Sequence, residues 1–267
     1  MKTSNDHRQS TSNRLIDLPV EIKQIIANYL PMCSLLNYRL CSKDLNYNYQ
    51  LSQQQLDELY NNKKLFNNAP AFKCYLQFKE PIGADFEYAI DKNLVDVVKV
   101  LLEDGRSDPS TNNNYAIQLT SAYGFTDIVR MLLDDQRVVP SSEDNQSIRQ
   151  ASEYGYPDIV KMLLNDERVD PSADDNSAIK LAAEGGHMDT VKVLLQDVRV
   201  DPSADDNYAI KYASENGYTE VVILLLNNER FRIDNETINY ILDREDNEEL
   251  HQMLMNKASE MEQSLSR

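Results

Sequence analysis

The stretch from Asp170 to Pro202 decides the fold, and it reads DPSADDNSAIKLAAEGGHMDTVKVLLQDVRVDP. It opens and closes on the same Asp-Pro pair, with the two prolines 31 residues apart. Four prolines follow that interval, at Pro109, Pro140, Pro171 and Pro202, and four glycines follow it in parallel, at Gly124, Gly155, Gly186 and Gly217. A repeat of fixed length predicts stacked copies of one small unit rather than a single globular core.

Each unit has the sequence pattern of two helices. The first is expected at residues such as 208–216, where Ile210 and Ala213 share one face. The glycine that follows stands where a helix commonly ends in a left-handed conformation. The second helix carries aliphatic residues at i, i+1, i+4 and i+5, such as Ile159, Val160, Leu163 and Leu164.

Proline marks the ends of these units. Pro157 fits the first turn of a second helix, where its missing N–H costs nothing. The Arg-Val-Asp-Pro-Ser segment between units predicts an extended connector, because proline restrains its own φ and the residue before it. One hairpin cannot bury both of its apolar faces alone. We therefore expect an all-α solenoid of helical hairpins, with about five to six repeats of 31 residues.

The limits of the array follow from where the pattern weakens. Asn93 stands where the first unit would have its glycine, and asparagine is the next-best residue for a left-handed conformation. After Arg230 the pattern decays, which is typical of a terminal capping unit. We expect the array, with its C-terminal cap, at residues 84–256, and a tail at residues 257–267.

Residues 176–195, NSAIKLAAEGGHMDTVKVLL, resemble an ankyrin repeat, whose pattern is TPLHxAAxxGHxEVVKLLL. The TPLH histidine is replaced, in two units by Lys180 and Lys211, which we expect to make local bonds or to face solvent. His187 follows the glycine as in the family and is expected to be a turn residue. The repeat is also shorter than the family's usual length of about 33 residues. This Asp-Pro-Ser variant is similar to ankyrin arrays encoded by giant DNA viruses.

The resemblance implies a non-enzymatic scaffold that binds a partner protein on its concave face, formed by the loop tips and the exposed side of the first helices. Tyrosines among acidic residues are suitable anchors there, because tyrosine offers a large contact area at low entropic cost. For any one residue, the alternative is an ordinary solvent-exposed loop side chain. The predicted partner-binding residues are Asn114, Tyr115, Tyr123, Glu153, Tyr154, Asp175, Asn176, Glu184, Asp206, Tyr208, Glu215 and Asn216.

Residues 14–49 predict a compact helical segment that resembles an F-box, although Leu45 replaces the usual aromatic residue. In that family the segment docks on the Skp adaptor of cullin-based ubiquitin ligases, and the repeats select the target. The alternative is a stand-alone ankyrin binder or inhibitor that sequesters a host protein, with this segment as a structural cap. We expect disorder at residues 1–13 and a helical adaptor at residues 50–83. The predicted adaptor-binding residues are Leu18, Pro19, Ile22, Ile26, Leu30, Leu35, Leu36 and Leu40.

Charge is unevenly distributed along the chain. Residues 1–80 contain 10 basic and 7 acidic residues, a balance of +3, whereas residues 81–267 contain 17 and 37, a balance of −20. An acidic surface repels phosphate groups, so nucleic acids and anionic membranes are poor partners for the array. A basic protein surface is the favoured partner.

The sequence shows no familiar catalytic or metal-binding pattern. Its three cysteines have no paired spacing and its three histidines lie far apart, so we expect no enzyme activity, no cofactor and no metal site. The longest aliphatic run, Val221 to Leu226, is far shorter than the roughly 20 residues that cross a bilayer. Residues 1–13 are polar and lack the apolar core of a secretory signal. We expect a cytoplasmic monomer, in the host cell if the protein is viral.

Overall fold

The computed structural model describes residue 69, residues 83–244 and residues 247–265. The chain divides into two units between Pro81 and Ile82, and the helices described below all belong to the second. The segments expected at residues 1–13 and 14–49, and nearly all of the segment at residues 50–83, lie outside the described residues. The predicted adaptor-binding residues from Leu18 to Leu40 therefore remain predictions.

Twelve helices and no strands are found in residues 83–244 and 247–265, and the helices form six consecutive pairs. This confirms the all-α repeat solenoid. The pairs are α5 (Gly83–Asp91) with α6 (Val95–Asp104), α7 (Thr111–Tyr123) with α8 (Thr126–Asp134), α9 (Ser142–Glu153) with α10 (Pro157–Leu164), α11 (Ala173–Glu184) with α12 (Met188–Leu195), α13 (Ala204–Glu215) with α14 (Thr219–Leu226), and α15 (Asn235–Leu242) with α16 (Glu248–Leu265).

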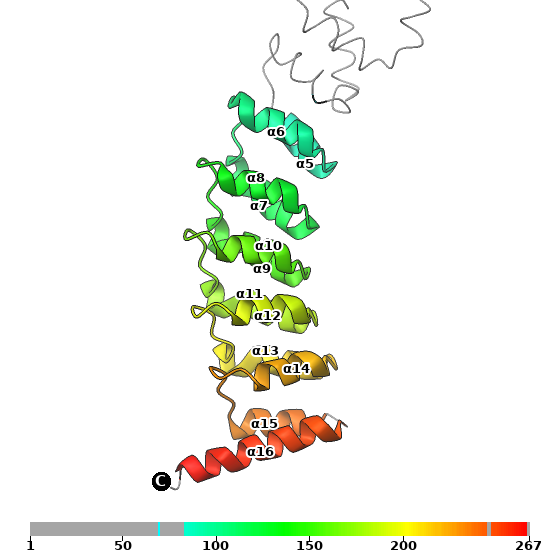
Figure 1. Cartoon of the computed structure of the whole chain (residues 1–267), viewed down its shortest axis with the longest axis vertical. Coiled ribbons are helices and arrows are strands. Elements are labelled where there is room, and N and C mark those ends of the chain that lie inside the picture. The colour runs from blue at the N-terminus through cyan, green and yellow to red at the C-terminus, as the bar shows by residue number, and fades with distance from the viewer. Residues whose placement is uncertain (1–68, 70–82, 245–246, 266–267) are drawn as a thin grey trace, which may run out of the picture. The chain divides into compact units, whose positions relative to one another are not determined.

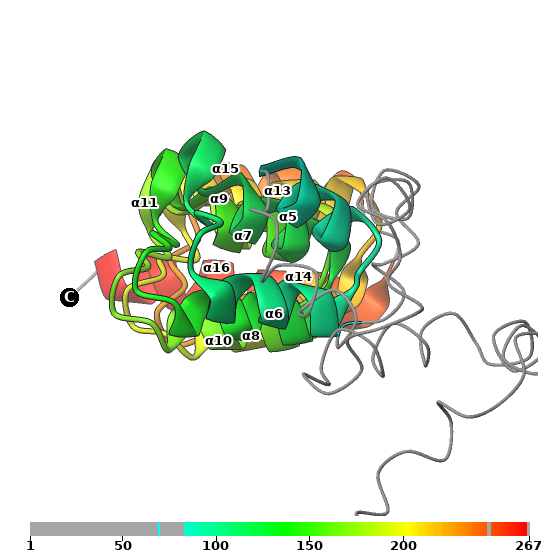
Figure 2. The same cartoon turned by 90° about the horizontal axis from the view of Figure 1, so that it is seen from above.

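The pairs stack one above another in chain order (Figure 1). Seen from above, the first helices of the pairs form one layer and the second helices form another (Figure 2). Contacts join α7 to α9, α9 to α11 and α11 to α13 within the first layer, and α8 to α10, α10 to α12 and α12 to α14 within the second. Each pair therefore packs on its neighbours, as a solenoid requires.

Buried aliphatic side chains form the interior between the two layers. Ile159, Val160 and Leu163 of α10 are fully buried, whereas Leu164 is only half-buried. In α13, Ile210 and Ala213 are fully buried on one face of the helix, as their spacing predicts. The stripes identified in the sequence are thus the surfaces that hold the two layers together.

The conformations predicted at the ends of the first helices are confirmed. The glycines at the 31-residue interval all have positive φ, and Gly124 has a φ of 76°. Asn93, in the first pair, takes the same role with a φ of 51°. Pro157 lies in the first turn of α10, as expected. Left-handed residues therefore reverse the chain between the two helices of each pair.

One left-handed turn that the sequence analysis did not predict begins each of α7, α9, α11 and α13. In α11 it consists of Asp174, Asp175 and Asn176, whose φ values are 54°, 51° and 61°. The amide N–H of Asn176 donates to the carbonyl oxygen of Ser172 at 2.9 Å, which closes the turn. Asparagine and aspartate tolerate this conformation better than other residues with a Cβ atom. The right-handed part of each first helix starts only after this turn.

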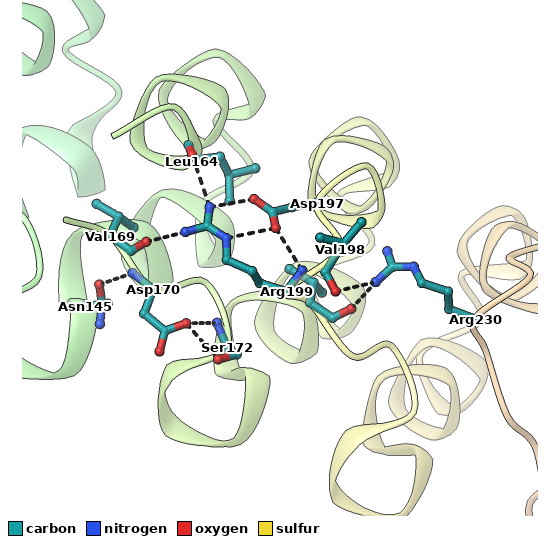
Figure 3. Close-up of polar contacts among 10 residues, drawn as sticks. Asn145, Leu164, Val169, Asp170, Ser172, Asp197, Val198, Arg199 and Arg230 are labelled. Carbon is teal, nitrogen blue, oxygen red and sulfur yellow. Dashed lines mark hydrogen bonds and ion pairs between the residues drawn. The ribbon is translucent and has the colours of Figure 1, made fainter. Parts of the chain in front are cut away.

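The Asp-Pro-Ser motif forms a tight turn, and the expectation of an extended connector is corrected accordingly. Oδ1 of Asp170 accepts hydrogen bonds from the backbone N–H and the hydroxyl of Ser172, at 2.9 and 2.7 Å (Figure 3). An aspartate that bonds its backbone two residues on favours a turn over an extended strand. Pro171, between them, is buried against the stack.

An arginine clasp joins each of four connectors to the repeat before it, and Figure 3 shows the clasp of Arg199. Arg199 donates from Nη1 to the carbonyl oxygen of Val169 at 2.8 Å and from Nη2 to that of Leu164 at 3.1 Å. Its Nε and Nη2 also donate to the two oxygens of Asp197, at 3.0 and 2.6 Å. Arg137, Arg168 and Arg230 make the corresponding bonds to backbone carbonyl oxygens. In the clasps of Arg137, Arg168 and Arg199, an aspartate two residues earlier orients the guanidinium so that it can bridge two repeats.

The last pair differs from the others, as a capping unit should. Asp234 caps α15 by accepting a hydrogen bond from the amide of Thr237 at 2.6 Å. Helix α16 is 18 residues long and continues to Leu265, beyond the end of the array expected at residue 256. Leu250 and Leu254 of α16 are fully buried, so this longer helix closes the C-terminal end of the interior.

Candidate partner-binding face

The first helices turn one side toward the interior and another toward solvent. In α13 the solvent side carries Tyr208, Lys211, Tyr212 and Glu215, which are spaced i, i+3, i+4 and i+7 and so form one stripe. We call the corresponding stripes of four helices the first-helix face; two of its positions, Gln118 and Ser177, are only 9% exposed. Its positions are Tyr115, Gln118, Leu119 and Ala122 in α7, Gln146, Arg149, Gln150 and Glu153 in α9, Ser177, Lys180, Leu181 and Glu184 in α11, and Tyr208, Lys211, Tyr212 and Glu215 in α13.

Exposed tyrosines border this face in the first two of these helices. Tyr115 is 45% exposed, and Tyr123 and Tyr154, at the C-terminal ends of α7 and α9, are 49% and 52% exposed. In α13, the rings of Tyr208 and Tyr212 stack with centroids 4.0 Å apart. Large aromatic surfaces left open to water are unusual in a stable fold, and they are enriched at protein interfaces.

Glutamates lie beside the tyrosines at one position in each of three successive first helices. Glu153 and Glu215 are exposed and Glu184 is half-buried. Oε2 of Glu184 accepts a hydrogen bond from the hydroxyl of Tyr208 at 3.1 Å, and Oε2 of Glu215 accepts one from Tyr240 at 3.4 Å. Burial and the bond to Glu184 raise the pKa of Tyr208 to about 12, so its hydroxyl keeps the proton that it donates.

Basic side chains of the face are paired with acidic residues of the next repeat. Nζ of Lys180 lies 2.9 Å from Oδ2 of Asp205, and Arg149 forms the equivalent pair with Asp174. This confirms the local bonding expected for Lys180. Lys211 occupies the same position in α13. Two of the three cations of the face thus pair with aspartates of the next repeat and not with the glutamates.

Two residues predicted to contact a partner lie inside the stack instead. Asn114 is 6% exposed, and it accepts from the amide of Val139 at 2.7 Å while donating to the hydroxyl of Ser142 at 2.8 Å. Asn176 is 9% exposed and accepts from the amide of Asp201 at 2.7 Å. Their amide groups tie each repeat to the next, so these two residues do not belong to the partner-binding face. A buried polar group must find such a partner.

The remaining predicted residues keep an exposed or half-buried position. Asp175 and Asp206 are exposed in the left-handed turns. Asn216 is exposed beyond the end of α13 and donates to the carbonyl oxygen of Glu184 at 3.1 Å. The predicted glutamates thus lie on the first-helix face together with Tyr115 and Tyr208, whereas Tyr123 and Tyr154 lie at its border and the two aspartates at the neighbouring loop edge.

His187 is a structural residue of the turn between α11 and α12, as expected. Its Nε2 lies 2.8 Å from the carbonyl oxygen of Glu153 in the preceding repeat, and the residue directly precedes α12. Its ring covers Gly155, where a Cβ atom would overlap it. Tyr218 covers Gly186 in the same way one repeat later. These rings pack against backbone at Gly155 and Gly186, whereas nothing lies within 4 Å of the Cβ position of Gly217.

The described residues contain no group of three or more His, Cys, Asp or Glu side chains that could hold a metal ion. Among the same residues, no helix is long and apolar enough to cross a membrane. The chemistry of the first-helix face is that of aromatic contact, hydrogen bonding and negative charge. Such a surface is suited to binding a protein.

A family model for ankyrin repeats matches residues 86–175 and 148–239. The chain belongs to the ankyrin repeat family. No curated protein matches the chain in a sequence search. Ankyrin repeats are protein-interaction modules, so the family agrees with an array that acts as a protein–protein interaction scaffold.

Proposed function

We propose that this ankyrin protein binds a basic partner protein on its first-helix face and catalyses no reaction itself. The observation that carries the proposal is the combination of exposed tyrosines with a glutamate in three successive first helices, Glu153, Glu184 and Glu215. The tyrosine rings supply contact area. The carboxylates attract the basic side chains of the partner and determine where along the face it binds. We expect the protein to act as a cytoplasmic monomer.

A charge reversal on the face tests this proposal. Replacing Glu153, Glu184 and Glu215 together by lysine should abolish capture of basic proteins by the immobilised chain, because the partner's cations would meet like charges. Capture by the unaltered chain should weaken as salt is added, since screening acts beyond about 8 Å at physiological ionic strength.

The matched control changes the same number of charges in the same repeats. Asp158, Asp189 and Glu220 are exposed in α10, α12 and α14, and they also recur every 31 residues. Their replacement by lysine should leave capture intact. If the two triple variants lose the partner equally, the binding surface is not the first-helix face and the proposal fails.

We further propose that residues 14–49 dock on a Skp adaptor, which would make the protein the substrate receptor of a cullin-based ubiquitin ligase. The support is the F-box-like spacing of the residues from Leu18 to Leu40. Co-purification with the adaptor should be lost on replacing both Leu18 and Pro19 by alanine, while the helical content of the array is unchanged. Absence of any adaptor in the complex would favour the stand-alone binder, whose N-terminal segment only caps the array.

A further inference from the structure

The glutamates of the first-helix face have a regular spacing that constrains the shape of a partner. Glu153, Glu184 and Glu215 occupy one position in α9, α11 and α13, which contact one another in that order. Packed helices lie about 8–10 Å apart, so adjacent carboxylates are separated by about that distance along the stack. A partner that meets all three must present its cations at the same interval.

A partner in an extended conformation matches this interval if it carries a basic residue at every third position. A polyproline II helix rises about 3.1 Å per residue and has three residues per turn, so every third side chain points the same way after about 9.3 Å. An α-helix returns to the same face only after seven residues, or about 10.5 Å, so three cations would need a helix of about fifteen residues but an extended segment of only about seven. The extended chain therefore meets the row with the shorter segment.

We propose that the first-helix face binds an extended segment of a partner protein that carries lysine or arginine at every third position, one cation per repeat. This inference rests on the proposed function and adds the conformation and sequence register of the bound segment. The partner's basic side chains pair with Glu153, Glu184 and Glu215, while their aliphatic stems lie on the tyrosine rings.

The contacts of the glutamates support this arrangement. The Tyr208 hydroxyl holds Oε2 of Glu184 at 3.1 Å, and the Tyr240 hydroxyl holds Oε2 of Glu215 at 3.4 Å. In each case the second oxygen is left for another donor, and the carboxylate is already oriented before the partner arrives. A carboxylate that is already oriented loses less conformational entropy when the partner binds.

Two of the three basic side chains of the face, all but Lys211, are paired away from the glutamate row. Lys180 and Arg149 are held by Asp205 and Asp174 of the following loops, so they neither neutralise the glutamates nor repel the partner strongly. Tyr154, at the end of α9, and Tyr212, in α13, are exposed near the two ends of the row. A lysine or arginine stem can therefore cover a ring while its charge reaches a carboxylate.

Two peptides of identical composition test the register. One consists of four Lys-Pro-Ser units, and the other has its four lysines together followed by four Pro-Ser units. Both carry the same charge and the same proline content. We expect the intact chain to bind the first peptide about tenfold more tightly by fluorescence anisotropy, because only that peptide can pair with three carboxylates at once.

A pair of single variants from one repeat shows whether the preference comes from the face. Glu184→Gln should remove most of the tenfold preference, since it deletes the central charge. Asp189→Asn, on the exposed side of α12, should leave the preference unchanged. Equal binding of the two peptides by the unaltered chain, or no binding of either, would overturn the inferred register.

Failure of the inferred peptide register can be distinguished from failure of the proposed function. If the peptides show no preference while the triple charge reversal still abolishes partner capture, the face binds a partner of another conformation. If the triple reversal has no effect on capture, the proposed function itself fails.

Discussion

Position 155 imposes two requirements, on its φ value and on the space for a Cβ atom, that glycine alone meets. Its φ is 72°, a left-handed value that a residue with a Cβ adopts at a cost of about 1 kcal/mol or more. A Cβ atom there would also overlap the ring of His187, whose Nε2 contacts the carbonyl oxygen of Glu153. Backbone conformation and packing between repeats therefore both select glycine at this position.

The two requirements can be separated with a second glycine. Gly105 has a φ of 76°, but nothing lies within 4 Å of the position of its Cβ atom. We expect Gly105→Ala to cost about 1 kcal/mol of unfolding free energy, and Gly155→Ala to cost about 1–2 kcal/mol more. Urea denaturation of both variants measures the difference, and equal losses would show that the ring contact contributes nothing.

Arg199 connects two repeats through backbone carbonyl oxygens, and a lysine cannot reproduce its fork of donors. We expect Arg199→Lys to lower the unfolding free energy by about 1–2 kcal/mol. Arg130, by contrast, pairs with Asp127 on the surface of α8, where both side chains are largely exposed. Arg130→Lys should have an effect near zero in the same urea experiment, and a comparable loss in both variants would refute a special role for the clasp.

The same clasp makes stability depend on pH. The hydrogen bonds from Arg168 and Arg199 hold the pKa values of Asp166 and Asp197 below their ordinary value of 3.8. A carboxyl group with a lowered pKa in the folded state stabilises the fold above its unfolded pKa, and this contribution is lost as the pH falls through the folded pKa.

The thermal midpoint should therefore change little between about pH 7 and pH 5 and fall between about pH 4 and pH 2. In Asp197→Asn the fall should be shallower, because one of the titrating groups is absent. Thermal melts followed by circular dichroism across this range provide the measurement. A variant that loses stability with the same steepness as the unaltered chain would contradict the role of Asp197.

The left-handed turn at the start of each first helix is the element that most distinguishes these repeats. In α11 it places Asp174 and Asp175 in solvent and turns Asn176 inward, where its side chain accepts from the amide of Asp201. Three successive left-handed residues are costly in most sequences. The turn persists because its last residue bonds both the preceding serine and the following connector.

Asp175 offers a direct test of this conformation, because its side chain is exposed and its φ is 51°. Asp175→Gly should leave stability unchanged within about 0.5 kcal/mol, since glycine adopts the left-handed region freely but loses more entropy on folding. Asp175→Val should cost about 1–2 kcal/mol, because a β-branched residue is strained there. Chemical denaturation of the two variants distinguishes them. If valine were tolerated as well as glycine, the residue would not be left-handed in solution.

The helix pairs could be predicted from the sequence, whereas the turns and clasps could not. Aliphatic stripes such as Ile159 and Leu163, and the glycines, follow from local periodicity and backbone preference. An Asp-Asp-Asn segment is equally typical of an ordinary loop or a helix start, so the left-handed turn leaves no distinct pattern. An Asp-Arg pair such as Asp197 and Arg199 recurs at the repeat interval, and this indicates a structural role. The partners of Arg199 could not be predicted, because they are backbone carbonyl oxygens, which every residue possesses.

Across the array, the six pairs build a surface that lengthens with each repeat. Every pair contacts its neighbours, so stacking fills the interior while the outer stripes of the first helices remain in solvent. With a balance of −20 over residues 81–267, the field of the array would attract the proposed basic partner before contact is made.

The tyrosines and glutamates of the candidate face could be predicted from the repeat register, because their positions in one unit apply to all. The same reasoning was wrong for Asn114 and Asn176, which are buried in the stack. Asparagine occupies this position in four successive units while its neighbours change, which indicates a structural role. Its burial depends on the left-handed turn, and that turn could not be predicted.

The most direct test of the account is hydroxyl-radical footprinting of the chain with and without its captured partner, because this method measures the exposure of individual side chains. The account predicts that binding protects Tyr212 on the first-helix face and Tyr154 at its border, and leaves Met255, which is 46% exposed on α16, as reactive as before. Protection of Met255 with unchanged reactivity of both tyrosines would contradict the account.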